Sequence, residues 1–218
     1  MNADEKEIIN NISNISNKNE GRKKINLPNK MTIFRVILVP VFMVFILIPF
    51  LGDVWSRILA AALILIAAIT DLIDGIIARK LNLITDFGKL MDPLADKFMI
   101  AGAMLAITAS KTFADISYLT VWATAIIFFR ELAVISIRLV ANSSEGNVIA
   151  ANFAGKFKMF SQCVCVLTIL LEDMVITKNI HTPPYLFSYM TTAFMLIATV
   201  FSGVVYFKIY WRYIDPTK

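Results

Sequence analysis

Six apolar stretches follow one another from residue 31 onward, and each is near or above the ~20 residues that cross a bilayer as a helix. They cover roughly 31–50, 56–79, 91–110, 115–140, 149–172 and 184–212. The hydrophobic share of 58% and the mean hydropathy of +0.70 exceed those of soluble domains. Because lipid offers no hydrogen bonds to the backbone, such stretches must be helical. The sequence therefore predicts an all-α polytopic membrane protein with six transmembrane helices.

The N-terminal segment differs in character from the rest of the chain. Residues 1–25 are polar, rich in Asn, Lys and Glu, and contain little that a core could bury. We expect a disordered tail or a surface helix there, and assign it no function. Since the apolar stretches are joined by short connections, residues 26–218 are expected to form a single six-helix domain.

Basic residues are unevenly distributed between the loops. They gather in the tail, after the second and fourth stretches and near the C-terminus, whereas the other loops hold only Arg57, Lys111 and Lys178. The positive-inside rule then predicts cytosolic termini and a multi-pass protein of the cell membrane. The net charge is +5, but the basic residues lie between apolar runs rather than along one polar face. Anionic lipid headgroups or phosphorylated substrates are therefore favoured as partners, and nucleic acid is not.

Four aspartates mark the junction of the second and third stretches. Asp71 and Asp74 close the second stretch, while Asp92 and Asp96 open the third. Spacings of three and four residues place each pair on one helix face, and the short loop suggests antiparallel neighbours whose faces meet. Converging carboxylates at membrane depth require protonation, cationic partners or bound metal. Oxygen ligands suit Mg²⁺ or Mn²⁺, of which two ions can bridge phosphate oxygens. The alternative is pairing with nearby basic residues such as Lys97.

Small residues accompany these aspartates on the same faces. Gly75, Ala78 and Gly88 leave space in which a ligand could approach, although helix packing explains them equally well. Arg79 follows at the end of the helix. Its guanidinium could clamp a diphosphate, or it could anchor the helix at the membrane surface.

Together these residues read D-x2-D-G-x2-A-R-x8-G-x3-D-x3-D, from Asp71 to Asp96. The pattern resembles the signature of the CDP-alcohol phosphatidyltransferase family at every fixed position. The resemblance implies a six-helix membrane enzyme, usually a homodimer, with its active site at the cytosolic side. Such an enzyme transfers the phosphatidyl group of CDP-diacylglycerol to an alcohol, and CMP leaves.

The resemblance also implies roles for individual residues. Asp71, Asp74 and Asp92 would bind metal ions, and Asp96 would complete the metal site while acting as general base on the acceptor hydroxyl. A further set would surround the cytidine diphosphate part of the donor: Gly75, Ala78, Arg79 and Gly88.

The acceptor alcohol is indicated by other parts of the chain. The stretches 26–35, 92–97, 130–134 and 155–158 resemble family members whose acceptor is sn-glycerol 3-phosphate. A phosphorylated acceptor requires cations, and four are available: Arg130, Arg138, Lys156 and Lys158. Arg130 lies well inside an apolar stretch, where a ligand or Glu131 must compensate its charge. Met159 departs from the pattern, which often has Thr there.

The sequence is compatible with two other functions. Another family member would use a different acceptor, such as phosphatidylglycerol, serine or an inositol phosphate. From a different class, the same carboxylates could line a divalent-cation transporter. A transporter would be expected to show internal repeats, and none is evident in this sequence. In the first stretch, Thr32 and Arg35 could reach the site, although surface anchoring explains Arg35 equally well.

Overall fold

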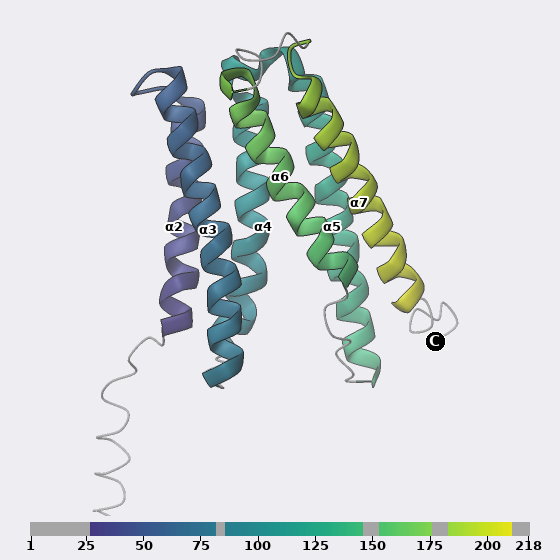
Figure 1. Ribbon diagram of the computed structural model, residues 1–218. Coiled ribbons are helices and arrows are strands. Elements are labelled where there is room, and N and C mark those ends of the chain that lie inside the picture. Colours follow the sequence, from purple (N-terminus) through teal and green to yellow (C-terminus); the bar gives the residue numbers. More distant parts are fainter. Residues whose placement is uncertain (1–26, 82–85, 146–152, 176–182, 211–218) are drawn as a thin grey trace, which may run out of the picture.

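The computed structural model describes residues 27–81, 86–145, 153–175 and 183–210, and all of its regular structure is helical (Figure 1). The elements are α2 (Leu27–Leu47), α3 (Asp53–Leu81), α4 (Asp86–Ala109), the short 3₁₀ helix η1 (Lys111–Ile116), α5 (Ser117–Glu145), α6 (Phe153–Val175) and α7 (Leu186–Tyr210). Each long helix coincides with one of the six apolar stretches. The all-α prediction is thus confirmed over the described residues.

Within the described residues, four segments are long and apolar enough to cross a membrane. They are Lys30–Leu47 in α2, Asp53–Asp71 in α3, Lys111–Ile137 over η1 and α5, and Leu186–Tyr210 in α7. The other two helices, α4 and α6, carry charges at positions 86–97 and 156–158, and α6 carries two more at 172–173. These charges shorten the apolar part of α4 and α6, and several of them lie around the candidate site described below.

Successive helices alternate in direction (Figure 1). The N-terminal ends of α2, α4 and α6 therefore meet the C-terminal ends of α3, α5 and α7 at one end of the bundle, here called the site end. Arg57 and Lys111 lie at the other end, here called the opposite end. This arrangement places Lys30, Lys156 and Lys208 together at the site end, as the charge distribution of the sequence predicts.

Among the described residues, α2 packs extensively on both α3 and α4, whereas few contacts join α3 to α4. The two helices run antiparallel, as expected. Most side chains on their aspartate faces lie outside the described part of the structure, so the expectation that these faces meet stays a prediction. The packing of α2 on α4 is close: a Cβ on Gly102 would lie 2.8 Å from Val39 Cγ1. The short loop sets the directions of α3 and α4, but the α2 contacts set their distance.

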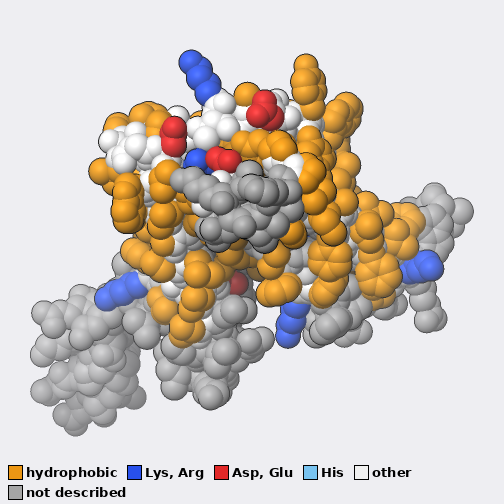
Figure 2. Space-filling model, turned by 45° about the horizontal axis from the view of Figure 1, so that its top comes forward, with side chains coloured by type: hydrophobic (Ala, Val, Ile, Leu, Met, Phe, Trp, Pro, Cys, Tyr) orange, Lys and Arg blue, Asp and Glu red, His pale blue; other side chains and the backbone are white. Residues whose placement is uncertain are grey.

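A core of large apolar side chains fills the bundle, including Phe42, Ile64, Met104 and Ile169. Apolar side chains also cover much of the described outer surface (Figure 2). Phe129 and Trp122, for example, are 75% and 69% exposed. Exposed apolar surface of this extent is typical of a protein whose surroundings are lipid.

The opposite end is held together by polar contacts. Glu172 is buried and accepts hydrogen bonds from the backbone N–H groups of Phe187 and Ser188, at 2.8 and 2.6 Å. These are first-turn donors of α7 that no helical carbonyl can satisfy, so Glu172 caps the helix. Nearby, Arg57 pairs with Asp173 at 3.4 Å. These contacts fix α6 against α7 and α3, away from the candidate site.

Candidate active site

Asp71, in the last part of α3, is paired with a buried arginine of α2. Arg35 Nη1 lies 2.6 Å from Asp71 Oδ1, and the Arg35 side chain is fully buried while that of Asp71 is 25% exposed. Thr32, three residues earlier on the same face of α2, is also buried. Arg35 is therefore a partner of the first aspartate rather than a surface anchor.

Asp96, in α4, presents an unsatisfied carboxylate oxygen. Its Oδ1 atom is buried and has no hydrogen-bond partner among the described residues. An unpaired buried acceptor costs about 1–3 kcal/mol, and more when charged, unless a ligand satisfies it. A cation or a substrate hydroxyl would do so.

Several predicted site residues have side chains outside the described part of the structure. Their backbones lie in the last turns of α3, the first turns of α4 and the C-terminal part of α5, all at the site end. These residues are Asp74, Gly75, Ala78, Arg79, Gly88, Asp92 and Arg138. Among the side chains that are described, no three acidic, histidine or cysteine groups come together as a metal site.

Glu131, in α5, joins two buried cations. Its Oε1 atom lies 2.5 Å from Lys158 Nζ and 2.9 Å from Arg130 Nη1. All three side chains are at most 14% exposed. One carboxylate oxygen is thus shared by two positive charges, so a net positive charge remains in a poorly solvated place. Such a place favours a further anion.

Helix α7 holds the Arg130 guanidinium from the other side. Arg130 Nη2 donates to Ser202 Oγ at 2.6 Å, and its Cζ atom lies 5.6 Å from the centre of the Tyr206 ring. Gly203 leaves the room for this contact, since a Cβ there would lie 3.3 Å from Arg130 Cγ. Ser202 and Tyr206 sit in an apolar run with no charge or motif to mark them, and the sequence analysis did not find them.

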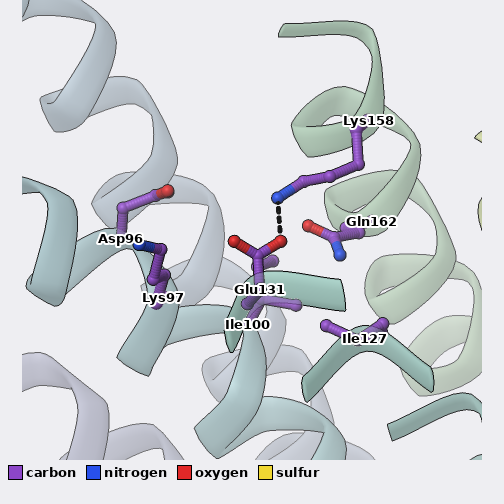
Figure 3. A pocket seen from close by; sticks show the side chains of 7 residues that line it. All are labelled: Asp96, Lys97, Ile100, Ile127, Glu131, Lys158 and Gln162. Atoms are coloured by element: carbon purple, nitrogen blue, oxygen red, sulfur yellow. Dashed lines mark hydrogen bonds and ion pairs between the residues drawn. The ribbon is translucent and has the colours of Figure 1, made fainter. Parts of the chain in front are cut away.

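A cavity of about 200 Å³ brings the carboxylate and the cations together. Asp96 lines it from α4, Arg130 and Glu131 from α5, Lys156 and Lys158 from α6, and Tyr206 from α7. A smaller recess continues from the same residues and is shown in Figure 3, where the Glu131 carboxylate lies between Asp96 and Lys158. A phosphorylated small molecule could thus contact the cations while its far end reaches Asp96.

Comparison with known proteins shows the family to which the chain belongs. A family model described as CDP-alcohol phosphatidyltransferase matches residues 25–205. The chain belongs to this family. A CDP-diacylglycerol–glycerol-3-phosphate 3-phosphatidyltransferase of Bacillus subtilis (strain 168) is 36% identical over 196 residues, which are 86% of this chain and 96% of the relative.

Two further relatives of this phosphatidyltransferase carry similar names. A probable phosphatidylglycerophosphate synthase of Mycobacterium tuberculosis (strain ATCC 25618 / H37Rv) is 32% identical over 85% of this chain and 82% of its own length. The CDP-diacylglycerol–glycerol-3-phosphate 3-phosphatidyltransferase of Escherichia coli (strain K12) is 34% identical over 67% of this chain and 78% of its own length.

The predicted site residues whose side chains are described fall into two groups on this phosphatidyltransferase bundle. Asp96, Arg130, Lys156 and Lys158 line one cavity, whereas Asp71 is described beside Arg35. Glu131 entered the sequence analysis only as a partner of Arg130. Its bond to Lys158 crosses from α5 to α6, and such a contact between distant parts of the chain has no local sequence signal.

Proposed function

We propose that this protein transfers the phosphatidyl group of CDP-diacylglycerol to sn-glycerol 3-phosphate. The products are phosphatidylglycerophosphate and CMP, in phosphatidylglycerol and cardiolipin biosynthesis. One observation carries the choice of acceptor: Asp96 and the cations Arg130, Lys156 and Lys158 line the same cavity. A site for an alcohol that also bears a phosphate needs this pair of features.

The cations are assigned to the phosphate of the acceptor. Arg130 offers a planar fork of donors and Lys158 a point charge, and both are held in place by Glu131. Lys156 is exposed at the cavity and adds charge at its mouth. Arg138 is proposed as a fourth member of this set. Because Arg130 and Lys158 are buried, their attraction for a phosphate is weakly screened by salt.

Asp96 is assigned as the general base. Its carboxylate would accept the proton of the acceptor's primary hydroxyl as that oxygen attacks the phosphorus of the phosphatidyl group. A bond forms between the hydroxyl oxygen and this phosphorus, and the bond from phosphorus to the oxygen of CMP breaks. The proton then passes from Asp96 to solvent, and CMP leaves with the bonding electrons.

The donor side of the site is assigned to the aspartates. Members of this family generally use divalent metal ions. Asp71, Asp74, Asp92 and Asp96 would hold two Mg²⁺ or Mn²⁺ ions, and the unpartnered Oδ1 of Asp96 fits a ligand of this kind. Bound ions would neutralise charge on the diphosphate. The residues proposed to surround the cytidine diphosphate are Gly75, Ala78, Arg79 and Gly88.

The membrane topology is inferred from the helix directions and the positions of the basic residues. We assign all six long helices as transmembrane, with the site end and both termini at the cytosolic face of the cell membrane. The alternating directions of the helices and the basic residues of the site end support this topology. Residues 26–218 would form the catalytic domain, which we expect to act as a homodimer, with residues 1–25 as a tail outside it.

Release of CMP tests the proposal directly. The purified full-length protein, with CDP-diacylglycerol and Mg²⁺ or Mn²⁺, should release CMP when glycerol 3-phosphate is added, and a chelator should stop the reaction. Phosphatidylglycerol, serine and inositol phosphate should be tried in parallel, because faster CMP release with one of them would change the acceptor. Absence of CMP with every acceptor would contradict the enzyme assignment and leave cation transport to be tested.

A further inference from the structure

The recess shown in Figure 3 has two layers built from the same three helices. The upper layer consists of charged side chains. The lower layer lies one helical turn further from the site end and is mostly apolar. Each helix contributes one residue to each layer, and a spacing of four residues puts its two residues on the same helix face. The pairs are Asp96 and Ile100 on α4, Glu131 and Ile127 on α5, and Lys158 and Gln162 on α6.

Gln162 is the polar member of this otherwise apolar lower layer. It is 2% exposed, and its Nε2 atom has no hydrogen-bond partner among the described residues. A buried amide donor left unpaired costs about 1–3 kcal/mol. The side chains of Ile100 and Ile127 beside it offer no acceptor, whereas a group that enters the recess can satisfy the amide.

The recess admits only a small group. Its free volume is about 10 Å³, which is room for one water-sized oxygen. Glu131 supplies an acceptor from the layer above, and Gln162 supplies a donor from below. A hydroxyl can accept one hydrogen bond and donate another, so it matches this pair.

The proposed acceptor carries such a hydroxyl at the matching place. With its phosphate at Arg130 and Lys158 and its primary hydroxyl at Asp96, glycerol 3-phosphate has one group left between them, the secondary hydroxyl on its central carbon. In Figure 3 the Glu131 carboxylate lies between Asp96 and Lys158, and Gln162 lies beside Glu131, one turn of α6 deeper than Lys158.

We propose that Gln162 is a specificity-determining residue that binds the secondary hydroxyl of the acceptor, with Glu131 as the second partner of that hydroxyl. This inference rests on the proposed function and adds to it a requirement for a vicinal diol next to the phosphate. Sites that bind a hydroxyl through buried polar groups reject analogues that lack it, because those groups are then left unpaired.

A comparison of two acceptors tests this requirement. 3-Hydroxypropyl phosphate keeps the phosphate and the primary hydroxyl of glycerol 3-phosphate and lacks only the secondary hydroxyl. We expect the unmodified protein to use it with a kcat/KM lower on the order of 10- to 100-fold. Gln162→Met, which conserves volume, should lower kcat/KM for glycerol 3-phosphate by a similar factor and that for 3-hydroxypropyl phosphate by much less.

Three results would overturn the inference: equal use of both acceptors by the unmodified protein, equal losses for both acceptors in Gln162→Met, or no loss for either. Equal losses would point to a bound water or a packing role. If Gln162→Met does not accumulate, Gln162→Asn, which withdraws the amide by one methylene, should show the same selective loss. Absence of CMP release with glycerol 3-phosphate in the unmodified protein would instead refute the proposed function.

Discussion

Arg35 and Asp71 form an ion pair of 2.6 Å that joins α2 to the last part of α3, toward the site end of the bundle. The arginine is fully buried, so its charge depends on this carboxylate and on its other contacts. Since α4 packs on α2, the pair also links α3 to the helix that holds α4. Arg35 thus sets the position of Asp71.

Replacing Arg35 should therefore affect both stability and turnover. Loss of one partner of a buried pair costs ~3–5 kcal/mol, and the partial exposure of Asp71 places this pair at the lower end. We expect Arg35→Gln to lower the Tm in detergent and to reduce kcat at least tenfold. Arg57→Gln is the matched control, since Arg57 is also buried and pairs with Asp173 at the opposite end. This control should lower the Tm without changing kcat, and intact turnover in Arg35→Gln would contradict the role of Arg35 in positioning Asp71.

Glu131 is the counter-ion of Arg130 and Lys158 when no acceptor is bound. Its removal should therefore change how strongly a bound phosphate stabilises the protein. Glu131→Gln removes this negative charge, so the repulsion between the two cations should destabilise the free protein. A bound phosphate should compensate their charge and restore stability. We expect a lower Tm and a larger increase of Tm on addition of glycerol 3-phosphate than in the unmodified protein.

The control for this experiment is Glu172→Gln, which removes a buried carboxylate at the opposite end. It should lower the Tm while leaving the ligand-induced increase unchanged. An increase in Glu131→Gln no larger than that of the unmodified protein would show that the cations do not bind the phosphate.

Ser202 positions Arg130 through a 2.6 Å hydrogen bond from Nη2. Hydrogen bonds to charged groups contribute about 1.5–3 kcal/mol, so Ser202→Ala should raise the KM for glycerol 3-phosphate by roughly tenfold or more. The KM for CDP-diacylglycerol should stay the same, since Arg130 is assigned to the acceptor. Ser188→Ala, the same change at the other end of α7, should alter neither KM. Parallel increases in both KM values would indicate a general disturbance of α7.

The substitution Asp96→Asn distinguishes a role of Asp96 as general base from a role in binding the donor. The amide cannot accept the proton of the acceptor, so turnover should fall by at least 100-fold, as for loss of a general base. Binding of CDP-diacylglycerol, measured with the purified variant in detergent, should persist. If donor binding is lost as well, Asp96 acts as a structural ligand and the base must be sought elsewhere.

The sequence by itself determined the helices and the region of the site. Long apolar stretches in lipid must be helical because their backbone groups have no other hydrogen-bond partners, and this local rule needs no tertiary information. The same local reading found the aspartates and the basic residues. Of these, Asp96, Arg130, Lys156 and Lys158 line one cavity, and their roles remain predictions.

Only the tertiary structure decided which helix faces meet. It placed α2 against both α3 and α4, paired Arg35 with Asp71 and joined Glu131 to Lys158. It also brought Ser202 to Arg130 and Gln162 to the recess that Asp96 lines. Apolar helix faces gain little by turning from lipid to protein, so hydrophobicity does not select among them. Close packing at small residues such as Gly102 and buried polar contacts make that selection, and both depend on residues far apart in the chain.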